Sequence, residues 1–438
     1  MREKPVDKWI IEPVKRFINN SSMSGIVLFC SALVALILSN SPLSHAYHHL
    51  WEIKFKIGIG DFIIDKNLHH WINDGLMAVF FFVVGLELKR EIIDGELSNP
   101  RKALLPIAAA IGGMLFPAVI YFLFNNGKET ISGWGIPMAT DIAFALGVLY
   151  LLGDKVPVTL KVFVTALAIV DDIGAVLVIA FFYTSDISFV SLLTGAGFMA
   201  LMITGNIIGV RSPVFYGIFG IGGLWTAFLM SGVHATIAAV LAAFTIPADV
   251  KVTETAFRQR LNELTERFGN ARTRASTLVS KEQLHILEEI RNLSKNALTP
   301  LQRLEHSMHP LVVFIVMPVF ALANAGVVLS GNILQELTSP VTSGVFIGLL
   351  LGKLLGVYGV SFLFIKMNWA TLPEGMNKKH LIGAGFLAAI GFTMSLFITG
   401  LAFDKEIYLT QAKLGILSAS LIASITSFLI IRSASDKS

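Results

Sequence analysis

Four ionisable side chains stand inside long apolar stretches of the sequence. Asp141 lies in ATDIAFALGVL, Asp171 and Asp172 lie in LAIVDDIGAVLVIA, and Lys353 lies in GLLLGKLLGVYG. In a membrane-crossing helix each unpaired charge costs about 2.5–3.5 kcal/mol, so such groups must pair, lose their charge or line a wet cavity. A purely structural ion pair, buried between helices, would account for one of the acids and the lysine. The carboxylates left over favour an ion path.

The two adjacent acids cannot face one ligand equally. Side chains of neighbouring residues in a helix point about 100° apart. We therefore expect one of Asp171 and Asp172 to face a cavity and the other to face a partner such as Lys353. Carboxylates, the Thr140 hydroxyl and free backbone carbonyls are hard oxygen ligands that suit a small cation. Because carboxylates also bind protons, such a site can exchange one ion for the other.

Two of the apolar stretches contain helix-breaking residues. In GWGIPMATDIAF, glycines and Pro137 precede Thr140 and Asp141, and FLAAIGFTMSLFITG contains Gly391 in mid-stretch. Interrupted helices at membrane depth are tolerated where they line a cavity or are buried in protein. A matched pair of interruptions in corresponding halves points to a transporter's binding site.

The composition fits a membrane protein. Of the 438 residues, 54% are hydrophobic and only 15% are charged, against roughly 25% charged in soluble domains. This excludes a disordered chain, a coiled coil and a typical soluble enzyme. The single cysteine, Cys30, excludes a disulfide framework and a multi-cysteine metal site. We expect no cofactor, and no nucleic-acid partner despite the net charge of +4.

The sequence predicts an all-α polytopic membrane protein with about 12 transmembrane helices. The predicted spans are 23–39, 72–86, 103–124, 134–152, 157–183, 187–209, 212–229, 231–247, 310–329, 341–365, 380–401 and 408–432. If spans 3–5 and 10–12 are related units, each interruption falls in the middle helix of its unit.

Basic residues in the predicted loops set the orientation. When alternate loops are assigned to alternate sides, one side receives 26 Lys and Arg residues and the other receives 5. The positive-inside rule then makes both termini cytoplasmic. The first span is expected to be retained, with a cleaved signal peptide as the weaker alternative. The expected division is a cytoplasmic amphipathic segment (1–22), spans 1–8 (23–247), a cytoplasmic charged insert (248–309), spans 9–12 (310–432) and a cytoplasmic tail (433–438).

Two loops have distinctive patterns. Residues 51–65 alternate apolar and polar side chains around central glycines, which predicts a hairpin on the outer face. It either lies on its own subunit or contacts a second copy. Residues 250–305 carry ten Lys or Arg residues with apolar positions at helical spacing. They form either cytoplasmic amphipathic helices or a solvated linker.

At these residues the chain resembles the NhaA family of sodium/proton antiporters over nearly its whole length. The 250–299 segment departs from the family pattern because it is longer than the family's compact form. The motifs that carry the resemblance are INDGLMAVFFFVVGLELKRE (72–91), PMATDIAFALGVL (137–149), ALAIVDDIGAVLVIAFFYT (166–184), SGVHATIAA (231–239), PLQRLEHSMHP (300–310), FALANAGV (320–327), the Lys353 span and GFTMSLFI (391–398).

The resemblance implies an inverted repeat of spans 3–5 and 10–12, with two discontinuous helices that cross. It implies that Asp172 is the principal carboxylate for cation and proton, with sodium at Asp172 and Asp171. Asp171 would be alternately paired with Lys353. Thr140 and Asp141 would lie at the crossing, where Asp141 and Lys353 compensate the helix-end charges. The hairpin would form a homodimer.

The resemblance also implies a group of residues linked to pH regulation. They are Glu87, Glu91, His234, Glu305, His306 and His309. Each has an ordinary structural alternative. Glu87 and Glu91 could belong to a cytoplasmic salt-bridge cluster with their basic neighbours, and the histidines could cap helices or lie at the membrane interface.

These features together predict a secondary active antiporter of a bacterial inner membrane, not an enzyme. It would export cytoplasmic sodium or lithium in exchange for external protons, electrogenically and under pH control. Two rivals remain. An intramembrane aspartyl protease also uses two membrane aspartates, but none of Asp141, Asp171 and Asp172 stands in a Gly-x-Gly-Asp element. A cation channel needs neither a buried lysine nor a pair of broken helices.

Overall fold

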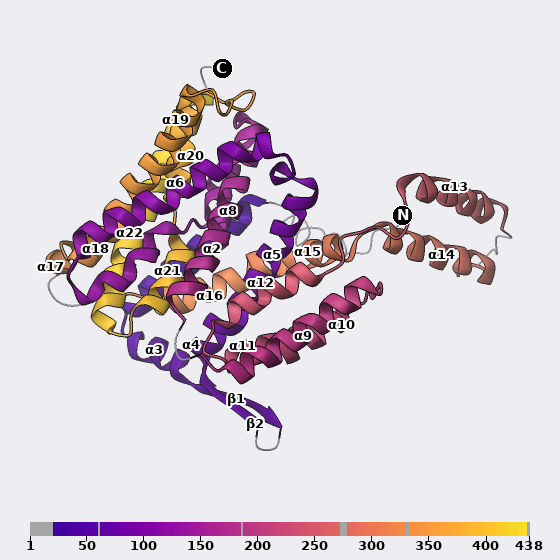
Figure 1. Ribbon diagram of the computed structural model, residues 1–438, viewed down its shortest axis with the longest axis horizontal. Coiled ribbons are helices and arrows are strands. Elements are labelled where there is room, and N and C mark those ends of the chain that lie inside the picture. Colours follow the sequence, from indigo (N-terminus) through magenta and orange to yellow (C-terminus); the bar gives the residue numbers. More distant parts are fainter. Residues whose placement is uncertain (1–20, 60–61, 185–186, 272–277, 330–332, 436–438) are drawn as a thin grey trace.

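The computed structural model describes residues 21–59, 62–184, 187–271, 278–329 and 333–435. Within them the chain is almost entirely helical, with one two-stranded hairpin (Figure 1). The predicted N-terminal amphipathic segment lies outside the described residues except at its last positions. The short elements between the main helices are α3 (Ser44–Glu52), α4 (Leu68–His70), η2 (Trp71–Leu76), η3 (Glu96–Ser98), η5 (Gly153–Lys155) and α17 (Ile333–Leu337).

Seven helical segments among the described residues are long and apolar enough to cross a membrane. Two further segments qualify if each bent pair of helices counts as one span. The seven are α6 (Pro100–Asn125), α8 (Val158–Phe182), α9 (Phe189–Ile207), α15 to α16 (Pro300–Asn324), α18 to α19 (Pro340–Lys366), α20 to α21 (Lys378–Ala402) and α22 (Glu406–Ser435). The bent pairs are α2 (Ser21–Ser39) with α3, and η4 (Glu129–Met138) with α7 (Ile142–Leu151).

The chain is therefore an all-α, multi-pass membrane protein, while the number twelve stays a prediction. Three predicted spans coincide with described helices that fall short of a full span. Helix α5 (Met77–Asp94) ends in the charged sequence ELKREIID. The apolar helices at Pro213–Leu229 (α10, η6 and α11) and Ala235–Thr245 (α12) have fewer than the roughly 20 residues that a bilayer requires.

Close helix packing places Lys353 in the interior. Lys353 lies between the wide helical turns η8 (Gly348–Gly352) and η9 (Leu354–Gly359). A side chain at Gly352 would come within 2.7 Å of the Pro117 backbone of α6, and one at Gly356 would collide with the Gly112 carbonyl. The glycine stripe therefore lets the two helices approach almost backbone to backbone.

The predicted hairpin is present. Strand β1 (Lys54–Ile59) pairs antiparallel with β2 (Phe62–Asn67), and its turn at 60–61 lies outside the described residues. It lies at the end of the molecule opposite the C-terminus (Figure 1). The apolar side chains of Ile53, Phe55 and Ile57 are about half exposed.

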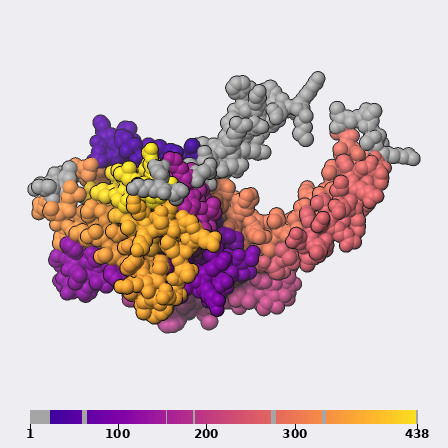
Figure 2. Space-filling model, turned by 90° about the horizontal axis from the view of Figure 1, so that it is seen from above, coloured from indigo at the N-terminus to yellow at the C-terminus, as the bar shows by residue number. Residues whose placement is uncertain are grey.

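The charged insert contains helices α13 (Glu254–Asn270) and α14 (Lys281–Ala297). Leu264 of α13, Ile286 of α14 and Ala271 form a small buried core between them. The two helices extend away from the helical body, as Figure 2 shows from above. This core is separate from the main one, so the insert packs largely on itself.

Candidate functional site

The two interrupted segments meet in the middle of the helical body. The first interruption separates η4 from α7, and the second separates α20 (Lys378–Ala388) from α21 (Phe392–Ala402). The Asp141 amide donates to the Ile390 carbonyl at 2.7 Å, and the Thr140 hydroxyl donates to the Ala388 carbonyl at 2.9 Å. Carbonyls freed by one broken helix are thus satisfied by donors from the other.

Asp141 lies at the start of two helices. Its Oδ1 accepts a hydrogen bond from the Phe144 amide at 2.9 Å and caps α7. Its Oδ2 accepts from the Thr393 amide at 3.0 Å and from the Thr393 hydroxyl at 2.6 Å, in the first turn of α21. Helix N-termini carry partial positive charge, so one fully buried carboxylate compensates both ends.

Lys353 joins the crossing to α8. Its Nζ lies 2.7 Å from Asp171 Oδ2, and both side chains are completely buried. The same Nζ donates to the Thr140 hydroxyl at 3.1 Å. The second oxygen of Asp171 has no hydrogen-bond partner. A buried pair of this kind is balanced only when its remaining polar atoms are also satisfied.

Asp172 has no cationic partner among the described residues. Its side chain is buried, and its Oδ1 makes no hydrogen bond. Burying an unpaired carboxylate is costly unless it holds a proton or a cation. The two adjacent acids therefore differ in role, and Asp171 rather than Asp172 contacts Lys353.

The arrangement fits a small hard cation. Three buried carboxylates and one buried lysine are present, Lys353 contacts Asp171, and carbonyl and hydroxyl oxygens gather at the interruptions. Among the described residues, no three His, Cys, Asp or Glu side chains form a cluster typical of a resident metal.

A cavity of about 580 Å³, here called the vestibule, is lined in part by residues next to this crossing. Its walls come from α5, α7, α8 and α15 (Pro300–Leu311). Ile142, next to Asp141, and Ile169, about one turn before Asp172, are among its lining residues. Apolar side chains make up most of the remaining lining, and the charged or titratable residues in it are Glu87, Arg90, Glu305, His306 and His309.

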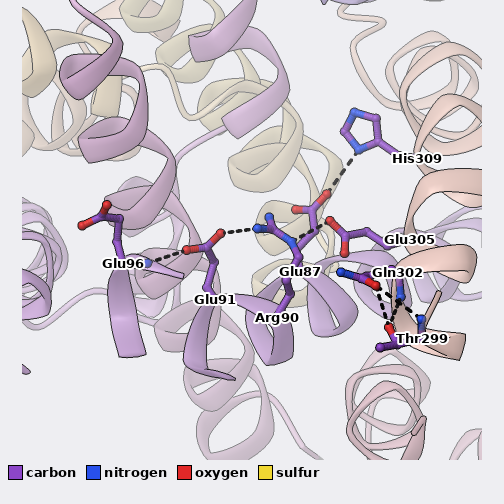
Figure 3. A network of polar contacts seen from close by, with 8 residues as sticks. All are labelled: Glu87, Arg90, Glu91, Glu96, Thr299, Gln302, Glu305 and His309. Carbon is purple, nitrogen blue, oxygen red and sulfur yellow. Dashed lines mark hydrogen bonds and ion pairs between the residues drawn. The ribbon is translucent and has the colours of Figure 1, made fainter. Parts of the chain in front are cut away.

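The polar residues of the vestibule form a network between α5 and α15 (Figure 3). Arg90 contacts Glu91 at 2.7 Å and Glu305 at 2.9 Å. The Glu87 carboxylate lies 3.2 Å from His309 Nδ1, and the two form an ion pair when the histidine is protonated. Glu91 Oε2 accepts a hydrogen bond from the Glu96 backbone amide at 3.1 Å. Glu91 is buried, but the other ionisable side chains of this network are half-buried or exposed, so water screens them more than the groups at the crossing.

The predicted residues therefore fall into two groups, with His234 apart from both. The first group is at the crossing, and the second lines or borders the vestibule. Within the second group, no hydrogen bond or ion pair joins His306 to another described residue. His234 lies elsewhere, before α12, where its Nε2 is 2.8 Å from the Tyr183 carbonyl.

Sequence reasoning missed two residues. Thr393 binds Asp141, and its position just after the break at Gly391 was a usable signal. Arg90 links Glu91 to Glu305. From the sequence LELKRE, only a local charged cluster could be inferred. Neither partner can be read from sequence spacing, because each contact joins helices more than 200 residues apart.

The fold and this site define a class of protein. A multi-pass helical bundle with ionisable groups at the crossing of two interrupted helices is a secondary transporter. The chain's family follows from comparison with known proteins.

A family model described as Na+/H+ antiporter 1 matches residues 15–431. The chain is 48% identical to Na(+)/H(+) antiporter NhaA 1 of Saccharophagus degradans, over 98% of this chain and 94% of that protein. It is 50% identical to Na(+)/H(+) antiporter NhaA of Oleidesulfovibrio alaskensis, over 98% and 95% of the two chains. The chain belongs to the NhaA family of Na+/H+ antiporters, which are transporters and not enzymes. The resemblance predicted from the sequence is thereby confirmed.

Proposed function

We propose that this chain exchanges cytoplasmic sodium or lithium for external protons across a bacterial inner membrane. The observation that carries the proposal is the pair of adjacent buried acids, of which only Asp171 contacts Lys353. Family membership supports sodium and proton as the exchanged ions. Asp172 and Asp171 bind the cation, while Thr140, Asp141 and Lys353 organise the site around it.

Competition at the carboxylates couples the two ions. At low pH the acids hold protons and the cation cannot bind. As pH rises they lose their protons, and sodium takes their place. The surplus of three acids over one lysine supports exchange of more protons than sodium ions in each cycle. Such exchange moves net charge and is electrogenic.

Alternating access completes the cycle. The vestibule opens toward Ile142 and Ile169 beside the acids, which supports access from one side at a time. The positive-inside bias supports cytoplasmic termini and a cytoplasmic vestibule. Movement of the segments that carry the two interruptions then exposes the same acids to the outer side.

The vestibule network supports pH regulation of this access. Glu87, Glu91, Glu305, His306 and His309 line or border the path that the cation takes. Histidine gains charge near physiological pH, so the Glu87–His309 contact responds to pH in that range. His234 acts separately, through its contact with the Tyr183 carbonyl.

Two copies form a homodimer through the hairpin at 51–65, within membrane lipid. The half-exposed apolar side chains of Phe55 and Ile57 in β1, and of Ile53 just before it, support this contact. The insert at 248–309 is a cytoplasmic helical unit between the two groups of spans, 23–247 and 310–432. The tail at 433–438 is cytoplasmic.

Dequenching of a pH-sensitive dye in proteoliposomes tests the exchange. Sodium, lithium and potassium are added separately between pH 6 and 9, to wild type and to Asp172→Asn. We expect sodium and lithium to collapse the proton gradient in wild type, with no response in the variant. Asp404→Asn, at an exposed loop acid, is the matched control and keeps wild-type exchange. Full exchange by folded Asp172→Asn protein contradicts the proposal.

A further inference from the structure

A long apolar groove lies between α2 and α22 on the lipid-facing side of the bundle. It has a volume of about 600 Å³, and α7 contributes its floor. Its rims are open, since Phe29, Leu421 and Leu429 are each about half exposed. From Leu417 to Leu429 it follows α22 for about 18 Å, at 1.5 Å per residue. The groove thus covers more than half of the roughly 30 Å hydrocarbon core.

The groove has few polar groups that could hydrogen-bond to water. Its polar side chains are three serines of α22. The hydroxyls of Ser418 and Ser424 donate to carbonyls of their own helix, and the Ser420 hydroxyl accepts from the Phe392 amide at 3.3 Å. Water enters a cavity only where polar partners remain free. Within a bilayer, the occupant that matches such a surface is an acyl chain.

One end of the groove carries positive charge. Arg432 lies four residues after Phe428 and seven after Ile425, so it shares the groove face of α22. Its exposed side chain makes no ion pair or hydrogen bond with another described residue. Lys378 and Lys379 line a small notch beside Ser433 at the same end of the helix. This cationic end complements the phosphate of an anionic headgroup.

We propose that the groove binds one anionic phospholipid, with an acyl chain along α22 and the headgroup phosphate at Arg432. The floor of the groove brings this lipid against side chains next to the crossing. The rings of Phe144 and Phe392 pack edge to face there, with centroids 5.6 Å apart. The Phe144 amide binds Asp141, and Phe392 precedes Thr393. The acyl chain therefore touches both interrupted helices.

Native mass spectrometry of the full-length, delipidated protein tests this binding without requiring transport. The probes are phosphatidylglycerol and phosphatidylcholine with identical acyl chains. Wild type is expected to retain one phosphatidylglycerol more tightly than phosphatidylcholine. Arg432→Gln is expected to weaken phosphatidylglycerol binding about fivefold, the effect of one interfacial cation, without changing phosphatidylcholine binding. Leu421→Trp fills the groove and is expected to abolish the tight binding of both lipids.

Two matched variants serve as controls. Ile422→Trp places the same ring on the neighbouring lipid-facing residue outside the groove, and Lys366→Gln removes another exposed cation at a helix end. Both are expected to bind lipid as wild type does. If Leu421→Trp misfolds by gel filtration, Ser424→Leu replaces it. Equal binding of the two lipids by wild type, or a tight lipid retained after the groove is filled, overturns the proposal.

Discussion

The crossing and the vestibule use the same residue types in different surroundings. At the crossing, Lys353 and Asp171 are completely buried at 2.7 Å from each other. In the vestibule, Arg90 contacts Glu305 at 2.9 Å, with about a third of the Arg90 side chain exposed. Removing one partner of a buried pair leaves an uncompensated charge, whereas water stabilises the survivor of an exposed pair. The first region should therefore govern folding and ion binding, and the second should adjust access.

The largest effect is expected from breaking the buried pair. Lys353→Met leaves Asp171 without its cation and should lower the free energy of unfolding by about 3–5 kcal/mol at neutral pH. Adding Asp171→Asn removes the stranded charge and should recover part of the loss. Thermal unfolding in detergent measures both. Lys405→Met, which breaks the exposed pair with Glu129, is the control and should leave the melting temperature unchanged.

A smaller effect is expected from the Asp141 cap. Thr393→Val removes the hydroxyl that donates to Asp141 and should cost about 1–3 kcal/mol, as expected for a bond to a buried charged group. Thr399→Val in the same helix removes only a hydroxyl bonded to the Ser395 carbonyl of that helix. It should cost less. Equal losses of unfolding free energy in the two variants would mean that the hydrogen bond from Thr393 to Asp141 adds no more stability than an ordinary hydroxyl bond within a helix.

In the vestibule, charge should affect affinity more than stability. Glu87→Gln removes an acid beside the cation path, so fewer cations gather there. We expect the sodium KM in the dequenching assay to rise about two- to fivefold at low ionic strength, and less in high salt. Glu282→Gln, at an exposed acid of α14, should leave KM unchanged. A salt-independent rise would place Glu87 in the binding site itself.

The smallest effect is expected at the hairpin, far from both regions. The hydrogen bond from Lys56 lowers the pKa of Asp65 below its ordinary value of 3.8. The pair therefore stabilises the hairpin above that value, and this stabilisation is lost as pH falls through the lowered pKa. Asp65→Asn should speed amide exchange in β1 at neutral pH and make no difference in strong acid. Lys66→Gln, with no ion pair among the described residues, should match wild type throughout.

Much of the architecture could be predicted from local patterns. Apolar stretches, the interruptions near Pro137 and Gly391, and the alternation in 51–65 each depend on neighbouring residues. The number of membrane spans was harder to predict from the sequence. Charged turns shorten the apolar part of α5, and α12 has only 11 residues, so length and composition alone do not establish twelve.

The sequence by itself determined that three acids and a lysine would lie among apolar helices, and that two of those helices would break. Only the tertiary structure decided which groups meet. It placed Asp171 rather than Asp172 against Lys353, which the helix spacing alone had left open, and it brought Thr393 to Asp141. The physical reason is the range of each effect. Helix formation depends on neighbours in the chain, whereas these contacts depend on how closely glycine-lined helices pack, which no single segment specifies.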